Sequence, residues 1–379
     1  MSGGRSFPLR AAWPLVAFPV AKLAIHLATI GGYGIFRDEL YYLACSRRLA
    51  WGYVDQPPFS IALLAIQRGL FGESLFALRI LPALAGAGIV LVVGLMTRRF
   101  GGGALAQSIA MACALAAPHA LAIHHFYSMN AFDGLVWALA AWLLVDLLAE
   151  PERRTRGWLA LGALLGSGLL NKVSVLWLGA GMAVGLALSP ARRSLRTPGP
   201  WLAAVLALLV FLPHLAWQAA NGWPTLEFIA NATGEKMAHI SPGAFLLRQV
   251  EMMNSFSVII WTGGLVWLAR KPQWRALAWI WLTVLVILVV NGASRPGYLA
   301  PAYAWLFAAG GVGWESEIDR RPWFSRVRWA LPVAVLAFGA LFAPLALPLL
   351  SVERYVAYAA RMGQAPSTDE RKQLGELPQ

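Results

Sequence analysis

Acidic side chains gather between the first two long apolar stretches of the chain. Residues 36–58 read FRDELYYLACSRRLAWGYVDQPP, and their carboxylates belong to Asp38, Glu39 and Asp55. A further acid, Asp133, opens a later apolar stretch. A carboxylate that is partly withdrawn from water has a raised pKa and is suited to act as a general base. Asp38 and Glu39 also have a simpler explanation, because acids favour the first turn of a helix.

Basic side chains at three other places are candidates for binding an anionic group. Lys172, Arg295 and Arg79 stand at the ends of apolar stretches, with few competing cations nearby. Arg295 and Tyr298 lie about one helical turn apart, and both can donate hydrogen bonds to phosphate oxygens. The alternative for each cation is a long side chain that reaches toward water at the membrane surface.

Metal and nucleotide sites have weaker signals. Asp38, Asp55 and Asp133 are candidate oxygen ligands for a divalent cation, but their spacing defines no geometry. The two cysteines, Cys45 and Cys113, provide neither a disulfide framework nor a metal motif. The sequence also lacks the GxxxxGK[ST] motif that cradles nucleotide phosphates. We therefore expect no nucleotide as an energy source and leave a divalent cation as an open option.

The composition indicates the class of protein. Hydrophobic residues make up 59% of the 379 residues, charged residues make up 13%, and the mean hydropathy is +0.60. A soluble protein of this size could not cover so much apolar surface. The net charge of +13 comes from basic residues in short clusters between apolar windows rather than on one helix face. This pattern excludes nucleic acid as a partner and predicts an all-α, polytopic integral membrane protein.

Apolar windows suited to cross a ~30 Å hydrocarbon core recur along the chain. Basic clusters follow alternate windows, as at Arg98/Arg99 and Arg192/Arg193, and the positive-inside rule then places the N-terminus in the cytoplasm and the C-terminus outside. Lys22 lies within the first window, and the sequence does not identify a partner for its charge. The windows, about eleven in number, are 11–30, 76–96, 104–124, 131–148, 157–170, 173–188, 200–217, 252–268, 274–290, 298–313 and 329–350.

Two connections on the external side are long and polar, residues 31–75 and residues 218–251. In the first, residues 38–49 have helical spacing and Pro57-Pro58 precedes a second helical pattern, which predicts two helices along the membrane surface. In the second, Gly222-Trp223-Pro224 indicates a turn and Ser241-Pro242 a helix start. We expect a transmembrane domain over residues 1–350 and a short external tail over residues 351–379.

An ordered set of motifs resembles a known family. After Asp38-Glu39 come GYVDQPP at 52–58, FGES at 71–74, NAFD at 130–133, LNK at 170–172, NGWPTLEF at 221–228 and YLAPAY at 298–303. The set resembles the GT-C superfamily of polyprenyl-phosphate-sugar-dependent glycosyltransferases, which includes protein O-mannosyltransferases and the bacterial lipid A aminoarabinose transferase. Each motif alone is weak, but the resemblance covers nearly the whole chain in order. It implies a GT-C type helical bundle with a catalytic domain over residues 1–350.

The resemblance implies an enzyme of the bacterial inner membrane that moves a hexosyl or pentosyl group. The donor would be a polyprenyl-phosphate-linked sugar, and the acceptor would be a hydroxyl of a glycan, lipid or protein on the external side. Direct displacement would invert the anomeric centre. Membrane lipids would be further partners, and a divalent cation is the one cofactor left open.

The resemblance also implies roles for individual residues. Asp38 would be the base, Glu39 its support and Asp133 a second acid of the cavity. The donor phosphate would be held by Lys172, Arg295, Tyr298, Arg79 and Gln56. The substrate cavity would be lined by Tyr41, Tyr42, Tyr53, Asp55 and Glu227.

Two positions depart from the relatives. Gln56 stands where some relatives have a lysine before the Pro-Pro, which removes one charged phosphate contact. Phe228 follows Glu227 where the aminoarabinose transferase has a metal-binding histidine, so Asp55 is the metal ligand candidate that remains. The alternative function is a transporter or flippase of a lipid-linked or anionic solute, which would place charges near the membrane centre and in broken helices.

Overall fold

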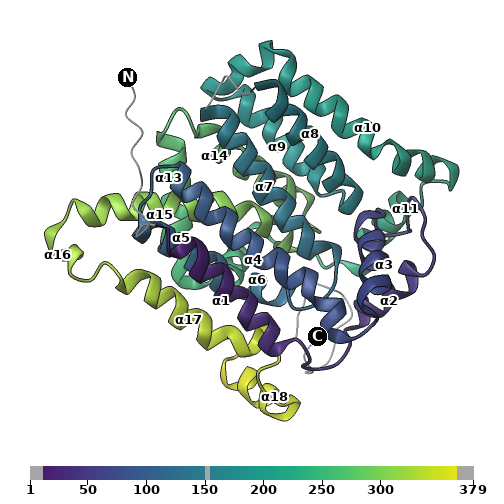
Figure 1. The fold of residues 1–379 in the computed structure, drawn as a ribbon, viewed down its shortest axis with the longest axis horizontal. Coiled ribbons are helices and arrows are strands. Elements are labelled where there is room, and N and C mark those ends of the chain that lie inside the picture. Colours follow the sequence, from purple (N-terminus) through teal and green to yellow (C-terminus); the bar gives the residue numbers. More distant parts are fainter. Residues whose placement is uncertain (1–11, 150–153, 365–379) are drawn as a thin grey trace.

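The computed structural model describes residues 12–149 and 154–364, and this part of the chain folds into helices without strands. The helices form one bundle, with α2, α3 and α11 gathered at one end of it and α16 at another edge (Figure 1). The bounds are α1 Pro14–Thr29, α2 Arg37–Ser46, α3 Phe59–Phe71, α4 Leu75–Arg99, α5 Ala104–Ala116, α6 Pro118–Ile123, α7 Met129–Ala149, α8 Arg154–Asn171, α9 Val175–Ala187, η3 Pro190–Arg196, α10 Pro198–Ala220, α11 Pro224–Asn231, η4 Ala232–Lys236, α12 Pro242–Met252, η5 Ser255–Ser257, α13 Val258–Arg270, α14 Arg275–Asn291, η6 Pro296–Tyr303, α15 Ala304–Asp319, α16 Pro322–Ser325, α17 Ala330–Ala346 and α18 Val352–Arg361.

Every predicted apolar window contains a helix. Within the described ranges, the helices α4, α7 and α10 are each long and apolar enough to cross a membrane. Two bent pairs, α9 with η3 and α12 with the segment from Ser255 to Arg270, would raise that number to five. The other apolar helices are shorter, so the total of about eleven crossings stays a prediction.

Three windows are interrupted where the sequence pattern predicted continuous helix. Pro118 ends α5 and starts α6, because proline cannot continue the hydrogen-bond ladder. The window at 298–313 begins as the 3₁₀-helix η6, which contains Pro296 and Pro301. The window at 252–268 is broken at Asn254, whose φ of 73° is left-handed.

Small residues let the helices of the bundle approach closely. A Cβ at Gly162 of α8 would lie 2.5 Å from the carbonyl oxygen of Ala203 on α10, and one at Gly264 of α13 would lie 2.0 Å from that of Leu306 on α15. Such contacts are typical of helix pairs in membranes, where packing rather than the hydrophobic effect drives association. α5 is the most enclosed of these helices, since all of its residues after Ala104 are buried.

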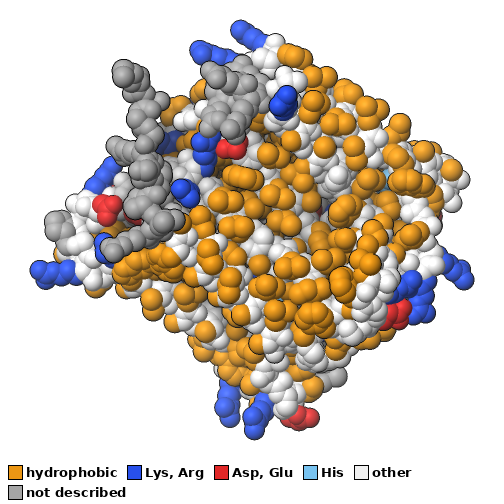
Figure 2. Space-filling view, in the orientation of Figure 1, with side chains coloured by type: hydrophobic (Ala, Val, Ile, Leu, Met, Phe, Trp, Pro, Cys, Tyr) orange, Lys and Arg blue, Asp and Glu red, His pale blue; other side chains and the backbone are white. Residues whose placement is uncertain are grey.

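The outer surface of the bundle is apolar across its middle. α10 exposes Trp201, Val205, Leu208, Leu209 and Leu212. Figure 2 shows hydrophobic side chains covering the centre of one face, with lysine and arginine side chains at its edges. A water-soluble protein rarely exposes so large an apolar patch, so this surface fits the hydrocarbon of a membrane.

The buried cation Lys22 finds its partners at the break between α5 and α6. Its ammonium donates to the carbonyl oxygens of Leu115 at 3.3 Å and Ala120 at 3.1 Å. Carbonyls at a helix end lack partners within the helix and carry partial negative charge. Lys22 is therefore satisfied by the backbone that Pro118 interrupts, and it stabilises that break.

Both long connections contain the local structure that their sequences predicted. The first contains α2 and α3, and the second has Gly222 and Trp223 at positive φ followed by α11. Ser241 caps α12 by accepting a hydrogen bond from the backbone of Ala244. In the predicted tail the helix α18 is observed, and residues 365–379 lie outside the described residues. That α2 and α3 lie along a membrane surface stays a prediction.

Candidate functional site

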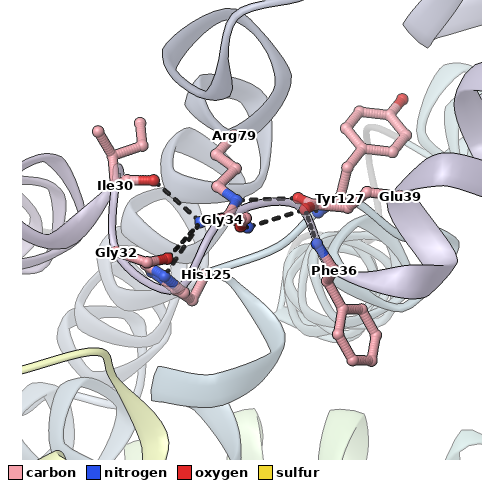
Figure 3. Close-up of polar contacts among 8 residues, drawn as sticks. All are labelled: Ile30, Gly32, Gly34, Phe36, Glu39, Arg79, His125 and Tyr127. Atoms are coloured by element: carbon pink, nitrogen blue, oxygen red, sulfur yellow. Dashed lines mark hydrogen bonds and ion pairs between the residues drawn. The ribbon is translucent and has the colours of Figure 1, made fainter. Parts of the chain in front are cut away.

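A fully buried ion pair fixes the start of α2. The carboxylate of Glu39 accepts from Arg79 Nε at 2.9 Å and from Arg79 Nη2 at 2.8 Å, and neither side chain is more than 4% exposed (Figure 3). The same carboxylate accepts from the backbone N–H groups of Phe36 at 2.8 Å and Tyr127 at 2.9 Å. Glu39 thus joins α2 to α4 and to the turn before α7. We call Glu39 and Arg79 the clamp.

The guanidinium of Arg79 is committed to protein acceptors. Besides Glu39 it donates to the carbonyl oxygens of Ile30, Gly32 and Gly34, and Nη1 lies 3.4 Å from His125 Nε2 (Figure 3). An arginine has five N–H donors, and all five are directed to these groups. The structure thus gives Arg79 a place in the clamp, and its predicted contact with a phosphate stays a prediction.

His125 completes the surroundings of the clamp. Burial, together with the positive charge of Arg79, lowers the pKa of His125 from 6.5 to about 4. The imidazole is therefore neutral at neutral pH, and its Nε2 can accept from Arg79. His125 thus assists the clamp only as a neutral imidazole.

Asp38, next to Glu39 in the first turn of α2, is open to solvent. Its side chain is 52% exposed and lies 3.4 Å from Arg37 Nε. Tyr42 lies one turn after Asp38 along α2. Asp38 and Asp55 both act electrostatically on Tyr42, so both carboxylates lie in its surroundings. The clamp therefore fixes the helix that presents Asp38 and leaves the Asp38 carboxylate accessible.

Three tyrosines lie on α2 and on the segment that contains Asp55. The hydroxyl of Tyr41 donates to Asp55 at 2.6 Å, and burial together with this hydrogen bond raises the pKa of Tyr41. The Tyr42 hydroxyl accepts from the backbone of Met129 at 2.9 Å, and burial raises its pKa. The hydroxyl of Tyr53 accepts from the backbone of Ala50 and is held at the end of α2. These contacts join α2 to the segment that contains Asp55.

Gln56 is enclosed by protein. Its residue is 0% exposed, and neither polar atom of its amide has a hydrogen-bond partner within the described ranges. A buried amide without partners is costly, by roughly 1–3 kcal/mol per group. The amide of Gln56 is thus buried and unsatisfied among the described residues.

A second ion pair, with a buried carboxylate and a partly buried lysine, lies at the start of α7. Asp133 accepts from Ser174 Oγ at 2.9 Å with both oxygens and from Trp137 Nε1 at 3.1 Å, while Lys172 Nζ lies 3.5 Å away. Asp133 is 2% exposed. Its hydrogen bonds come from Ser174 and Trp137, so its charge orients Lys172 without a short bond to it.

Lys172 projects from the turn between α8 and α9 toward η6. Its ammonium donates to Asn130 Oδ1 at 2.7 Å and lies 4.8 Å from the centre of the Tyr298 ring. The ring of Tyr298 packs on Trp177 with centroids 5.7 Å apart. Cation–π contact and one short hydrogen bond hold the ammonium, which keeps capacity for an anionic ligand.

A cavity of about 70 Å³ lies beside this cluster. Small residues form much of its wall, and Asn130, which binds Lys172, is part of its lining. His119, His124 and Tyr303 are its other polar wall residues. Its wall thus combines apolar side chains with four polar residues.

The remaining predicted residues lie on neighbouring elements. Arg295 directly precedes η6, the helix that contains Tyr298. Glu227 is exposed in the first turn of α11. Among the described residues, no group of at least three histidine, cysteine, aspartate or glutamate side chains is arranged to hold a metal ion. The carboxylate of Asp55 accepts from Tyr41, and a metal at this position stays an open option.

We call Lys172 and the residues around it, Asp133, Asn130, Tyr298, Ser174 and Trp137, the Lys172 cluster. Sequence reasoning missed two of its members. Ser174 and Trp137 bind Asp133, yet serine and tryptophan in apolar helices carry no signal of their own. Trp137 lies four residues after Asp133, one turn along the helix, and this spacing could have suggested the pair. The contact of Ser174 depends on how α8 and α9 turn, which no local pattern reveals.

The comparisons with known proteins agree with the motifs. Residues 55–217 match the family described as dolichyl-phosphate-mannose-protein mannosyltransferase. The undecaprenyl phosphate-α-4-amino-4-deoxy-L-arabinose arabinosyl transferase 1 of Pseudomonas fluorescens is 25% identical over 76% of this chain and 57% of its own length. The lipid A galacturonosyltransferase RgtD of Rhizobium johnstonii is 25% identical over 82% of this chain and 66% of its own. The chain thus spans little more than half the length of the arabinosyl transferases it matches.

Solved structures show the same fold. ArnT of Cupriavidus metallidurans bound to undecaprenyl phosphate has a TM-score of 0.73 at 21% identity, covering 92% of this chain and 69% of that one. The oligosaccharyltransferase of Archaeoglobus fulgidus has a TM-score of 0.59 at 16% identity, covering 95% of this chain and 57% of its own. The resemblance of this chain to the GT-C superfamily of glycosyltransferases is thus confirmed by its sequence relatives and by its fold.

Proposed function

We propose that the chain is a membrane glycosyltransferase that moves a sugar from a polyprenyl-phosphate-linked donor to an acceptor hydroxyl on the external side. The observation that carries this proposal is the Lys172 cluster. There an ammonium is held by the Tyr298 ring and by Asn130, a residue that also lines a small cavity, in a fold shared with a protein bound to undecaprenyl phosphate. The relatives that transfer aminoarabinose and galacturonosyl groups support the same class of reaction.

The phosphate of the donor would be bound by Lys172 from one side and by Arg295 and Tyr298 at η6 from the other. In displacement at the anomeric carbon, the bond to the phosphate oxygen breaks and the phosphate leaves with an additional negative charge. A cation that is already in place stabilises that charge without rearrangement. The buried Asp133 would then act as a positioning residue for Lys172 rather than as a base, because Ser174 and Trp137 occupy its carboxylate.

Asp38 would be the base that takes the proton of the acceptor hydroxyl. Its exposure leaves the carboxylate free to reach a substrate, and Glu39 supports it indirectly by fixing the first turn of α2. Attack by the acceptor oxygen opposite the departing phosphate would invert the anomeric centre. A positioned base contributes roughly 10²–10⁴-fold to such a rate.

The site would lie on the external face of the bacterial inner membrane. The alternation of basic clusters supports this placement. The short connections at Lys172 and Arg295 have few cations, and the long connection that contains Asp38 belongs to the same set because the sides alternate along the chain. A lipid-linked donor presents its sugar phosphate at that surface, and the acceptor would be a glycan, lipid or protein hydroxyl there. No nucleotide would then be needed.

The alternative of a transporter or flippase has less support. Two helix pairs are sharply bent, as that alternative predicts, but the bends lie at Leu188–Pro190 and Met253–Ser255, at the ends of apolar windows. The buried cation Lys22 is satisfied by backbone carbonyls rather than by a solute site. Neither observation provides a path for a solute through the bundle.

The test is turnover with defined donors. The purified chain is incubated with undecaprenyl phosphate linked to aminoarabinose or to galacturonic acid and a lipid A acceptor, and the release of undecaprenyl phosphate is measured. We expect one donor to turn over and Asp38→Asn to reduce kcat by about 10²–10⁴-fold. Normal turnover by Asp38→Asn would exclude the role of Asp38 as base.

The matched control is Asp319→Asn. Asp319 is an exposed acid at the far end of α15, away from α2. Its substitution should leave kcat and the melting temperature unchanged. Equal losses in both variants would indicate a general effect of removing charge, and the assignment of Asp38 would fail.

A further inference from the structure

A chain of buried polar side chains connects α10 and α11 to the first long connection. His214 and Gln218 lie one turn apart on α10, Thr225 opens α11, and all three are at most 7% exposed. They continue the buried face that α10 otherwise makes from Gly199, Ala203, Ala207 and Phe211. Polar groups in such a place must be hydrogen-bonded to be tolerated. We call His214, Gln218 and Thr225 the latch.

Each hydrogen bond of the latch has a defined direction. His214 Nδ1 lies 2.9 Å from the carbonyl oxygen of Trp51, so Nδ1 carries the proton and Nε2 is an acceptor. Gln218 Nε2 donates to Thr225 Oγ1 at 2.6 Å and lies 3.4 Å from His214 Nε2. Thr225 N donates to Gln218 Oε1 at 3.2 Å, and the Thr225 hydroxyl donates to the carbonyl oxygen of Tyr53 at 3.3 Å.

Packing holds the same segment against α10. Gly52 lies between the two carbonyls that the latch binds, and a Cβ there would be 2.3 Å from the Trp217 ring. No other residue could bring this backbone so close to α10. The latch thus binds residues 51–53 on both sides of a tight contact.

The segment leads directly into the turn that presents Asp55 and Gln56. The backbone N–H of Tyr53 donates to the carbonyl oxygen of Gln56 at 3.0 Å and closes that turn. α2 holds the turn from the opposite side, through Tyr41 and Asp55. The partnerless amide of Gln56 therefore sits in a turn whose position is set by two separate elements.

We propose that the latch positions the turn from Tyr53 to Gln56 for the donor phosphate, so that Gln56 can donate to it where a charged side chain is lacking. This inference rests on the proposed function, because it concerns the donor of that reaction. His214, Gln218 and Thr225 are positioning residues, since they reach the donor only through the backbone of residues 51–56. The later external connection thereby takes part in donor binding without contributing a ligand to it.

The test compares Thr225→Val, which removes the hydroxyl at nearly constant shape, with Thr225→Ser, which keeps it. Binding of undecaprenyl phosphate alone is measured on the purified full chain. We expect Thr225→Val to weaken binding about threefold to tenfold, the loss typical of one hydrogen bond, and Thr225→Ser to bind as the unchanged protein does. With a sugar-linked donor, KM should rise by the same factor while kcat changes little.

Hydrogen exchange gives a readout that is independent of activity. In Thr225→Val the amides of residues 50–56 should exchange faster, while those of the α13 helix keep their protection. The control Thr262→Val removes a hydroxyl that bonds only to Val258 within α13, and it should change neither the exchange of residues 50–56 nor the binding.

The outcomes separate this proposal from the proposed function. Faster exchange of residues 50–56 with unchanged binding of undecaprenyl phosphate would overturn the positioning role and leave the proposed function standing. Unchanged exchange would overturn the latch itself. A chain that binds no undecaprenyl phosphate in any variant would contradict the proposed function, and the latch proposal would fail with it.

Discussion

Two ion pairs with a buried carboxylate lie in the described part of the chain, and they differ in how fully the hydrogen-bond donors of the cation are used. In the clamp, Arg79 and Glu39 are at most 4% exposed, and every N–H group of the guanidinium is directed to a protein acceptor. In the other pair, Lys172 lies 3.5 Å from Asp133, is 12% exposed and makes one short hydrogen bond to Asn130. The cation of the first pair thus has its donors directed to the protein, whereas the cation of the second makes one short hydrogen bond.

We infer from this difference that hydrogen-bond saturation, more than charge or burial, separates a structural ion pair from the binding site that we propose at Lys172. Both pairs have an acid that accepts from groups besides its cation. Glu39 uses those bonds to hold two backbone groups, those of Phe36 and Tyr127, whereas Asp133 is held by Ser174 and Trp137 and only orients its lysine. The predictions below separate the two roles by measuring stability and donor binding side by side.

The largest effect should follow the loss of Arg79. Arg79→Met leaves Glu39 buried without its cation, which costs about 3–5 kcal/mol for a broken buried pair. We expect a strongly lowered melting temperature and little folded protein. The matched control, Arg248→Met, breaks the exposed pair with Glu251 and should cost at most about 1 kcal/mol. Equal melting temperatures for both variants would refute a structural role for the clamp.

Lys172→Met should have the opposite pattern, with a large effect on donor binding and a small effect on stability. The loss of a charged donor to phosphate should weaken the binding of undecaprenyl phosphate by roughly 10- to 100-fold, while the folded state keeps the bonds of Asp133 to Ser174 and Trp137. Isothermal titration and a melting curve measure the two effects. The control is Lys271→Met, because Lys271 is an exposed lysine over the Trp267 ring. Normal binding by Lys172→Met would remove the residue from the donor site.

The clamp should also be sensitive to acid through His125. Its pKa is lowered from 6.5 to about 4 by burial and by Arg79, so the folded state binds fewer protons than the unfolded state between these values. Stability should therefore fall as the pH decreases from about 6.5 toward 4, by on the order of 1 kcal/mol at pH 5.5. Melting curves of His125→Gln should lose this part of the pH dependence. An identical pH dependence in the variant would show that His125 is not its source.

The smallest effect should come from Ser174→Ala. Removing this hydroxyl takes one neutral donor from Asp133 and loosens the orientation of Lys172, at a cost near 1 kcal/mol. Donor KM should rise about threefold to fivefold with kcat nearly unchanged. Ser108→Ala in α5, where the hydroxyl bonds only to the backbone of Ala104, serves as the control for removing a buried hydroxyl. A larger change in kcat than in KM would assign Asp133 a part in the chemical step.

Much of the architecture follows from local sequence. The apolar windows predict the helices because backbone groups in hydrocarbon must bond within their own segment. The turn at Gly222-Trp223-Pro224 and the start of α12 at Ser241-Pro242 are confirmed, since glycine, proline and serine act on their own neighbours. The breaks at Pro118 and Asn254 were missed, because a hydropathy window averages over a single residue.

For the candidate site too, the sequence reveals some features and only the tertiary structure reveals others. The acids, the basic residues and the motifs that carry the family resemblance are visible in the sequence, because each is a property of residue type and order. Long-range contacts decide which of these side chains are fully hydrogen-bonded within the protein. Such contacts join residues 40 or more positions apart, as between Arg79 and Glu39, or Ser174 and Asp133. A polar group is saturated by hydrogen-bond partners within about 3 Å, and only the tertiary structure decides which partners lie that close. For this reason Arg79 was assigned to the donor from sequence, whereas the folded chain places it in the clamp.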